Sequence, residues 1–304
     1  MKSRKHILFI LLATIILMGN SVPAFNHNLD KKLKKITILF TNDTHSRIEP
    51  FASNDKKFAN LGGYARRAAM VKQIRNEEKN VMLFDAGDVF QGTPYYNFYH
   101  GQLEYNLMSL MGYTAVNLGN HEFDEGLEGL FNLYPLAKFD ILSANYDFSE
   151  TILKDKIKPY EIYTVDGIKV GVFGLGVALK GLVSTTNYGK TKCLNPLEKA
   201  AEIAYLLKKT AHCDLVICLS HLGFSYQDDQ ISDMVLAKQS KNIDLIIGGH
   251  THTFLDKPCV VKNSDKEEVI ITQLGFGGTR LGRIDFYFTK NTVVKIAEID
   301  AKNK

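Results

Sequence analysis

Nine aspartate, asparagine and histidine side chains lie in five short polar clusters, and each cluster directly follows an apolar run. The clusters are DTH with Asp43 and His45, GD with Asp88, GNHEFD with Asn120, His121 and Asp124, SH with His221, and GHTH with His250 and His252. Such donors supply nitrogen and oxygen without thiolate, which suits zinc, manganese or iron(II) and disfavours copper(I) and iron–sulfur sites. We therefore expect a metal site with mixed nitrogen and oxygen ligands.

The candidates outnumber the ligands that one metal needs. A single metal uses three or four protein ligands. Two ions could be held, with one carboxylate as a bridge, most simply that of Asp88, by seven of the nine residues: Asp43, His45, Asp88, Asn120, His221, His250 and His252. Within DTH and GHTH the spacing is i, i+2, which predicts that the two side chains of each pair point the same way from an extended backbone. Two adjacent cations clamp an in-line displacement at phosphorus and lower the pKa of a bound water. The expected cofactor is a pair of divalent ions, drawn from zinc, manganese, cobalt and iron.

Each cluster taken alone has a simpler explanation. A single histidine at the end of a strand is more often a hydrogen-bonded structural residue than a metal ligand. Asp43 and Asp88 alone would be turn residues or helix N-caps. These explanations do not account for every cluster following an apolar run, so we favour one site built from five loops.

The elements between the clusters indicate how the chain brings them together. Apolar runs that predict strands begin near residues 36, 81, 115, 140, 168, 215 and 244, and helices are predicted over 61–78, near 102–112 and over 196–211. Strands that alternate with helices form parallel sheets covered by helices, and ligands bind beyond the carboxyl ends of those strands. The later segments VIITQLG, LGRIDFYFT and VVKIAEID predict strands that pair without crossover helices.

The first 24 residues have the layout of a secretory signal peptide. Lys2, Arg4 and Lys5 precede an apolar run over residues 7–18, and small residues follow up to Ala24. The run is shorter than the roughly 20 residues that span a bilayer. We therefore expect export, to the periplasm or the medium, with no stable membrane insertion after signal cleavage.

The composition after the signal peptide is that of an ordinary globular chain. The 304 residues are 45% hydrophobic, and without residues 1–24 there are 34 basic and 33 acidic side chains, so no nucleic-acid polymer is expected as a partner. The basic run 28–35 is interpreted as solvated, within a linker over 25–35 that precedes one domain over 36–304. The four cysteines show no CxxC spacing; Cys218 is expected to be a buried thiol, and disulfide formation after export stays open.

The set of clusters strongly resembles the calcineurin-like metallophosphoesterase superfamily, whose pattern is DxH, GD, GNH[ED], H and GHxH. More narrowly, LFTNDTH, GDVFQGTP, NLGNHEFDEG and GGHTH resemble its secreted 5′-nucleotidase family. The resemblance runs from about Ile36 to the GGTRLGRIDFYF segment. It implies an α/β fold, namely a four-layer α/β/β/α sandwich of two mixed sheets flanked by helices.

The resemblance also implies a role for each candidate residue. One metal would be held by Asp43, His45, Asp88 and His252, and the other by Asp88, Asn120, His221 and His250. His121 and Asp124 would form a catalytic dyad, in which His121 stabilises charge on the phosphate or protonates the leaving alkoxide and Asp124 orients it. Glu122 receives no role and is expected to be solvated.

Two-domain members of the family carry a C-terminal domain that recognises the base and the phosphate, and this sequence ends at Lys304, where that domain would begin. Either a separately encoded C-terminal-domain partner supplies it, which we slightly favour, or the protein is a stand-alone hydrolase of broad specificity. Tyr95, Tyr96 and Tyr99 offer rings for a base, but core packing is the simpler explanation. Arg280 is expected in a turn between strands.

The leading hypothesis is an exported dinuclear-metal phosphoesterase that releases phosphate from nucleoside monophosphates. Alternatives on the same fold are a 2′,3′-cyclic nucleotide phosphodiesterase, a UDP-sugar hydrolase and a hydrolase of sulfur compounds. The alternative from a different class is a subunit that binds metal or nucleotide without turnover.

Overall fold

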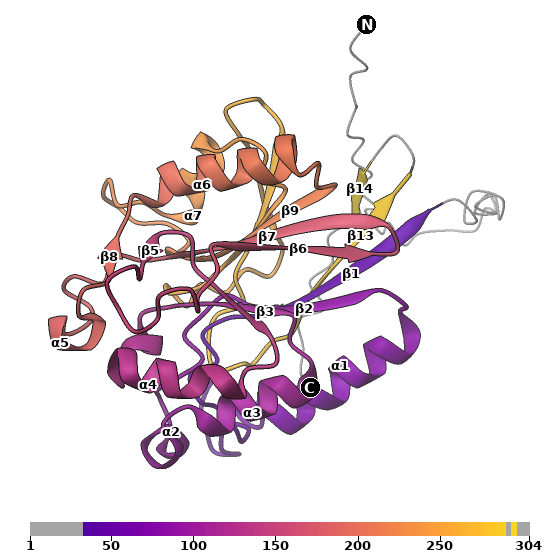
Figure 1. The fold of residues 1–304 in the computed structure, drawn as a ribbon. Helices are drawn as coiled ribbons and strands as arrows, with labels where there is room; N and C mark the ends of the chain where they lie inside the picture. Colours follow the sequence, from indigo (N-terminus) through magenta and orange to yellow (C-terminus); the bar gives the residue numbers. More distant parts are fainter. Residues whose placement is uncertain (1–32, 290–292, 297–304) are drawn as a thin grey trace, which may run out of the picture.

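The computed structural model of the protein describes residues 33–289 and 293–296. Two six-stranded sheets lie face to face, with helices on both outer faces (Figure 1). The first sheet has the strand order β14–β13–β1–β2–β3–β4, and the second has the order β11–β12–β10–β9–β7–β6. The predicted α/β sandwich of two mixed sheets is confirmed, while the predicted signal peptide lies outside the described residues.

The first sheet contains the beginning and the end of the described chain. Its strands are β1 (Lys34–Thr41), β2 (Val81–Asp85), β3 (Ala115–Asn117), β4 (Asp140–Leu142), β13 (Gly282–Phe288) and β14 (Val293–Ile296). Strands β1 to β4 run parallel, and β13 and β14 extend the sheet antiparallel from β1. Lys34 and Lys35 of the basic run are therefore strand residues, and the Lys35 ammonium lies 2.7 Å from the carboxylate of Glu78.

The second sheet is parallel in its centre and antiparallel at both edges. Its strands are β6 (Tyr160–Val165), β7 (Ile168–Gly176), β9 (Leu215–His221), β10 (Leu245–Gly248), β11 (Cys259–Lys262) and β12 (Glu268–Thr272), and a separate small sheet pairs β5 (Tyr146–Asp147) with β8 (Lys192–Cys193). The chain passes from β10 to its parallel neighbour β12 through edge strand β11 and without a helix. Together with the β13–β14 pair, this confirms the strands predicted near the end of the chain.

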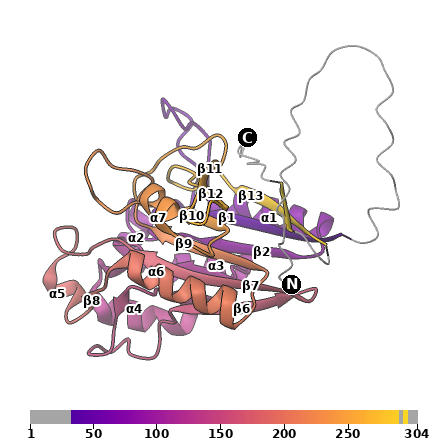
Figure 2. The same cartoon turned by 90° about the horizontal axis from the view of Figure 1, so that it is seen from above.

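Helices cover each sheet on the side away from the other sheet. The helical segments of the described chain are α1 (Tyr64–Glu77), α2 (Pro94–Tyr99), α3 (Gln102–Met111), α4 (Gly126–Leu133), the 3₁₀ turn η3 (Tyr134–Leu136), α5 (Thr185–Tyr188), α6 (Pro196–Tyr205) with its π-helical continuation η4 (Leu206–Thr210), and α7 (Asp233–Gln239), and the short 3₁₀ turn over His121–Phe123 is described with the site. Helices α1, α3 and α4 lie below the first sheet, and α6 and α7 lie on the second (Figures 1 and 2). The three predicted helices correspond to α1, α3 and α6. Helix α6 begins where Asn195 accepts a 2.9 Å hydrogen bond from the Leu197 N–H and Pro196 occupies the first turn.

The apolar core consists of three layers. The layer between the sheets contains Ile38, Phe40, Phe84, Ile217 and Phe286, all fully buried. The other two layers lie between each sheet and its helices. Strands buried on both faces read as continuous apolar runs, which explains why the sequence shows runs rather than alternation before each polar cluster.

The cysteines all lie among the described residues, and all four thiols are free. Cys218, on β9, is fully buried, as predicted. Within residues 33–289 and 293–296, none of the helices has the length and apolar character needed to cross a membrane.

Candidate functional site

The loops after five strands meet at the carboxyl-end edge of the two sheets. Asp43 and His45 follow β1, Asp88 follows β2, Asn120 follows β3, His221 is the last residue of β9, and His250 and His252 follow β10. The structure brings six of these seven residues, all except Asn120, into two adjoining groups of side chains. We call Asp43, His45 and His252 the outer cluster, and Asp88, His221 and His250 the inner cluster.

The backbone at these residues is not extended, so that part of the prediction is wrong. Asp43, His45, Asp88, His250 and His252 all have positive φ, between 46° and 75°. L-residues rarely adopt this left-handed conformation, and it collects at functional sites where surrounding contacts hold it in place. One such contact is the His250 N–H, which donates to Asp43 Oδ1 at 3.0 Å.

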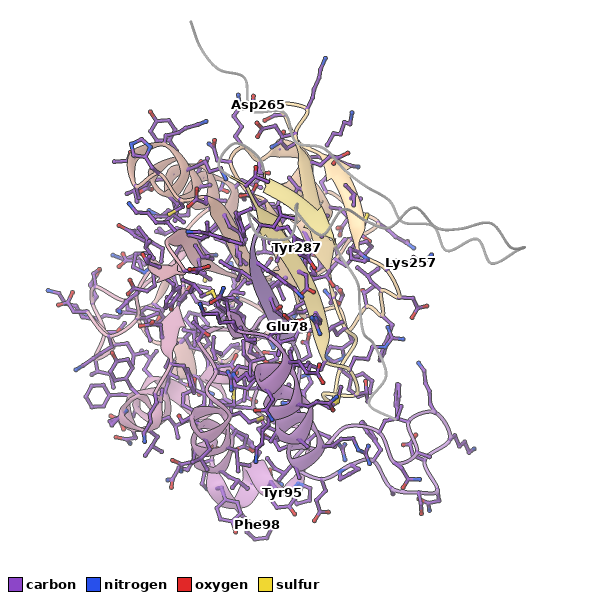
Figure 3. All side chains as sticks on the ribbon, turned by 90° about the vertical axis from the view of Figure 1, so that its right-hand side faces the viewer. Glu78, Tyr95, Phe98, Lys257, Asp265 and Tyr287 are labelled. Atoms are coloured by element: carbon purple, nitrogen blue, oxygen red, sulfur yellow. The ribbon has the colours of Figure 1, made fainter. Side chains whose placement is uncertain are left out.

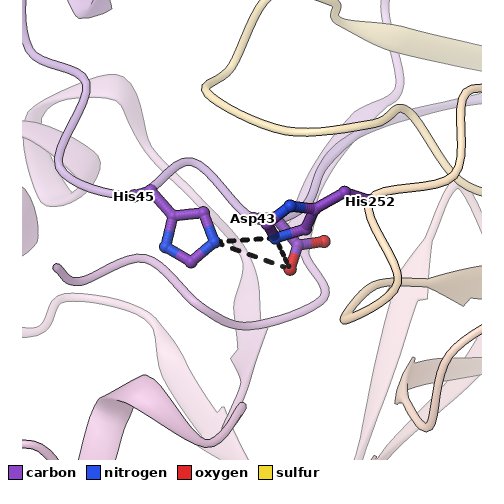
Figure 4. A group of neighbouring side chains, drawn as sticks. All are labelled: Asp43, His45 and His252. Atoms are coloured by element: carbon purple, nitrogen blue, oxygen red, sulfur yellow. Dashed lines mark hydrogen bonds and ion pairs between the residues drawn. The ribbon is translucent and has the colours of Figure 1, made fainter. Parts of the chain in front are cut away.

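The outer cluster converges on a small volume (Figure 4). His45 Nε2 and His252 Nε2 are 2.9 Å apart, and Asp43 Oδ1 lies 3.4 Å from His252 Nε2 and 3.9 Å from His45 Nε2. Asp43 is fully buried, whereas 40% of the His252 side chain is exposed. Two imidazole nitrogens and a carboxylate oxygen that point at one place are a donor set for a divalent cation.

The inner cluster adjoins the outer one and is more deeply buried. His221 Nε2 lies 3.0 Å from Asp88 Oδ2 and 3.9 Å from Asp43 Oδ1, and it is fully buried. The His250 ring centroid is 5.3 Å from that of His221. Asn120, only 7% exposed, has a buried Oδ1 with no hydrogen-bond partner among the described residues. An unpaired buried oxygen beside this donor set fits a further ligand for a cation.

Backbone carbonyls fix two of the histidine rings. His45 Nδ1 is 3.1 Å from the Phe90 carbonyl, and His221 Nδ1 is 2.9 Å from the Ala86 carbonyl. Each contact places a proton on Nδ1, so Nε2 is the nitrogen that is directed into the cluster. Ligating histidines in metal sites are usually held in this way.

The electrostatic environment favours the metal-binding forms of Asp88 and His250, whereas it favours the protonated form of His221, whose proton a cation would displace. Burial opposes ionisation of Asp88, but His221, His45 and His121 outweigh it and hold the pKa of Asp88 far below its usual range. Burial also acts to lower the pKa of His221, but Asp88 dominates and raises it to about 10. Burial and the nearby His221 lower the pKa of His250 to about 4. At neutral pH Asp88 is therefore an anion and His250 a neutral donor, as metal binding requires.

His121 and Asp124 form a hydrogen-bonded pair beside the outer cluster. The 3₁₀ turn η2 (His121–Phe123) brings them together, with His121 Nδ1 2.8 Å from Asp124 Oδ2. Although burial acts to lower the pKa of His121, the bond to Asp124 and the charge of Asp88 raise it to about 9. The His121 ring centroid is 5.4 Å from that of His45. Their geometry is that of an imidazole oriented by a carboxylate.

Glu122 is buried rather than solvated, which overturns the expectation for this residue. It is 2% exposed, and its carboxylate accepts hydrogen bonds from the backbone N–H groups of Asp88 at 3.0 Å, Val89 at 2.8 Å and Gly119 at 2.6 Å. Glu122 therefore joins the loop after β2 to the loop after β3. The GNHE sequence was the available signal, but its partners are backbone groups that no spacing reveals.

Glu122→Gln is expected to destabilise the protein, because an amide offers one acceptor oxygen where three N–H groups need acceptors. Leaving a buried donor unpaired costs about 1–3 kcal/mol, so the free energy of unfolding in urea should fall by about that amount. Glu128→Gln, a position on α4 away from both clusters, is the matched control and should change nothing. Equal unfolding midpoints for Glu122→Gln and the wild type would contradict this role.

Close backbone packing explains one of the glycines in the clusters. A Cβ at Gly119 would lie 2.2 Å from Asp88 Oδ1 and 2.8 Å from His221 Nε2, so only glycine fits there.

Asn42 is, after Glu122, a second residue that supports the site and that sequence reasoning missed. Its amide donates to Asp43 Oδ2 at 2.5 Å and to the Gly275 carbonyl at 2.8 Å, while its oxygen accepts from the Leu274 N–H at 2.9 Å.

The aromatic run near α2 is only partly core. Tyr96 is buried, as the packing interpretation expects, but Tyr99 is 49% exposed and its neighbour Phe98 is 77% exposed. Figure 3 shows Tyr95 and Phe98 at the lower edge of the molecule.

Arg280 lies between β12 and β13, as predicted, and pairs with Asp256 at 2.8 Å.

Comparison with known proteins agrees with the motifs. Residues 36–254 match the calcineurin-like phosphoesterase family. The chain is 34% identical over 275 residues to the 5′-nucleotidase of Rattus norvegicus, covering 84% of this chain and 46% of that protein. It is also 34% identical over 293 residues to the trifunctional nucleotide phosphoesterase protein YfkN of Bacillus subtilis, covering 86% of this chain and 18% of that protein.

Solved structures agree as well. The crystal structure of a 5′-nucleotidase precursor from Thermus thermophilus has a TM-score of 0.76 and 32% identity, covering 88% of this chain and 56% of that one. This chain spans less than half the length of the two curated relatives named above. The five clusters, the two sheets and the family match agree, and the chain belongs to the calcineurin-like phosphoesterase family.

Proposed function

We propose that this protein is an exported, secreted or periplasmic, metal-dependent phosphoesterase that releases phosphate from nucleoside monophosphates. The observation that carries the proposal is the contact between the two clusters, in which Asp43 Oδ1 and His221 Nε2 are 3.9 Å apart. Two cation sites so close together suit a single phosphoryl group. The 5′-nucleotidases among its relatives support a nucleotide as substrate.

The donor set fits two divalent cations, whose ligands we assign as the family resemblance implies. Asp43, His45, Asp88 and His252 would hold one, and Asp88, Asn120, His221 and His250 would hold the other. The carboxylate oxygens and histidine nitrogens that converge in each cluster, together with the unpaired Asn120 oxygen, support this assignment. When bound, the two ions supply Lewis-acid activation of the phosphate and of water.

The remaining chemistry falls to the His121–Asp124 pair, which we propose as the catalytic dyad. Because Nδ1 of His121 is bonded to Asp124, its Nε2 is free to donate a proton to the leaving alkoxide or to the phosphate oxygens. Asp124 would orient the ring and stabilise its positive charge. The backbone carbonyl of Asp124 is itself held by the Asn187 amide at 2.8 Å.

Substrate recognition is proposed to need groups beyond those described above. The matched relatives are about twice as long as this chain or longer, and the two clusters address the phosphoryl group of a nucleotide rather than its base. We propose that a separately encoded C-terminal-domain chain completes the nucleobase site. Co-purification of such a chain, with a lowered KM for AMP, tests this.

Metal removal tests the proposed function directly. Dialysis against a chelator is expected to abolish phosphate release from AMP, because the proposed reaction needs both ions to activate the phosphate and water. Adding manganese, zinc or cobalt should restore the activity, since the protein side chains that bind the ions remain in place. Hydrolysis of UDP-glucose or 2′,3′-cyclic AMP in the same assay would redirect the assignment within the family. A fully metallated protein that is inert towards all phosphoesters would contradict the proposal and leave a binding subunit.

A further inference from the structure

The outer cluster contains one histidine that no backbone carbonyl holds. His45 and His221 are each fixed at Nδ1 by a carbonyl, as described above. Among the residues that the structure describes, the hydrogen bond of the His252 ring is at Nε2, with His45, and Nδ1 has no protein partner. His252 is also the most exposed member of its cluster. The orientation of its ring therefore depends on that single bond and on the ring that packs against it.

The ring of Phe276 lies flat against His252. The two ring centroids are 5.1 Å apart and the planes differ by 19°, which is a stacked arrangement. Phe276 comes from the loop between β12 and β13, whereas His252 comes from the loop after β10. The stack therefore joins two loops that approach the site separately.

Phe276 is held in turn by three other phenylalanines. Its centroid is 6.1 Å from Phe51, 5.3 Å from Phe58 and 6.4 Å from Phe254, with interplanar angles of 90°, 89° and 74°. We call these four residues the phenylalanine cluster. The guanidinium of Arg47 lies 4.1 Å from the centroid of Phe51 and that of Arg280 lies 5.0 Å from the centroid of Phe254, so cations cover part of this cluster.

The backbone on either side of Phe276 is bonded to the other side of the outer cluster. The Gly277 N–H donates to the Asp43 carbonyl at 2.7 Å, and the Gly275 carbonyl accepts from the Asn42 amide at 2.8 Å. One short segment thus fixes the position of Asp43 through its backbone and faces His252 through its ring. In the part of the chain that the structure describes, the ring contact of the inner cluster is the one between His221 and His250 themselves, with no phenylalanine or tyrosine ring against either.

We propose that Phe276 is a positioning residue for the outer cation, and that the phenylalanine cluster sets the affinity of Asp43, His45 and His252 for a divalent metal through the orientation of His252. The inference rests on the proposed function only in assigning a cation to each cluster. It makes the two sites unequal. The outer site depends on the stacking of one ring, whereas in the inner site the fully buried His221 is held by the Ala86 carbonyl and packs on His250.

The test measures metal binding rather than turnover. Phe276→Leu keeps an apolar side chain but removes the flat ring face, and loss of a group that supports a ligand typically weakens metal affinity by roughly 10–100-fold. Calorimetric titration of the chelator-treated full chain with Mn²⁺ or Zn²⁺ should show that weakening at one of two sites. The other site should keep its wild-type affinity. Phe276→Tyr, which keeps the ring, should restore both.

Two further variants separate positioning from general loss of packing. Phe139→Leu removes a buried ring that packs on Tyr105, away from the candidate ligands, and should leave both affinities unchanged. Phe58→Leu removes a ring that packs on Phe276, so it should weaken the same single site by less than Phe276→Leu does. This second variant keeps the test decisive if Phe276→Leu does not fold.

Wild-type affinity at both sites in Phe276→Leu and Phe58→Leu would overturn the inference. So would equal weakening of both sites in step with a lowered melting temperature of the metal-free protein. Failure of the proposed function looks different, because the wild type itself would then bind no pair of cations or hydrolyse no phosphoester.

Discussion

His121→Ala is expected to lower the turnover of nucleoside monophosphates by about 10²–10⁴-fold, which is the usual contribution of general acid–base catalysis. The imidazole is oriented by Asp124 at 2.8 Å and is partly exposed beside the outer cluster, so it can reach a substrate oxygen. In our assignment it is not a metal ligand. Steady-state kinetics with AMP, together with elemental analysis, should therefore show lost turnover at unchanged metal content.

The chain offers a matched control for this change. His100 also pairs with a carboxylate, that of Glu125 at 3.0 Å, but it lies outside both clusters and 55% of its side chain is exposed. His100→Ala should leave the turnover number and metal content as they are. If His121→Ala also had wild-type turnover, the dyad assignment would be wrong. If the wild type bound nucleotide without any turnover, the binding-subunit hypothesis would replace the enzyme.

Asp88→Asn is expected to have the largest effect on metal content. The amide keeps the shape of the side chain. It also keeps an acceptor oxygen for the backbone N–H of His121, which donates to Asp88 Oδ1 at 2.9 Å. It removes the negative charge and one of the two oxygens that a bridging ligand needs. Because a supporting residue alone is worth roughly 10–100-fold in affinity, loss of the shared ligand should exceed that at both sites. Turnover should fall with the metal.

Elemental analysis of Asp88→Asn after gel filtration measures this outcome. Asp285→Asn, which changes a part-buried and ion-paired carboxylate of β13, controls for the loss of a structural charge and should retain two ions. Two firmly held ions in Asp88→Asn would show that the clusters do not share this carboxylate. The two sites would then have to be treated as separate.

The order of the elements could be predicted from the sequence, and so could the side chains that the structure groups in the outer and inner clusters. Metal-binding side chains of this kind are aspartate, asparagine or histidine, and a strand buried on both faces is a continuous apolar run, so DTH or GHTH after such a run is informative by itself. The parallel strands then bring the clusters to one edge. The left-handed backbone at Asp43 and His250 could not be predicted, because it depends on a hydrogen bond between residues 207 positions apart.

Supporting residues were missed for the same reason. Glutamate is rarely fully buried, so Glu122 was expected in solvent, yet three backbone N–H groups from two loops satisfy its carboxylate. Phe276 carries no signal at all in the sequence, since one phenylalanine among 18 does not reveal which ring it faces. Residue types indicate which side chains gather in the two clusters, but they do not predict what holds those side chains in place.

Each cluster takes its side chains from both sheets. Asp43 and His45 follow β1 of the first sheet and His252 follows β10 of the second, and Asp88 and His221 are divided in the same way. A nascent polypeptide that ended before β9 would hold no complete donor set. Cations would thus be acquired late in folding, once the sheets have docked, and their binding free energy would then oppose separation of the two halves.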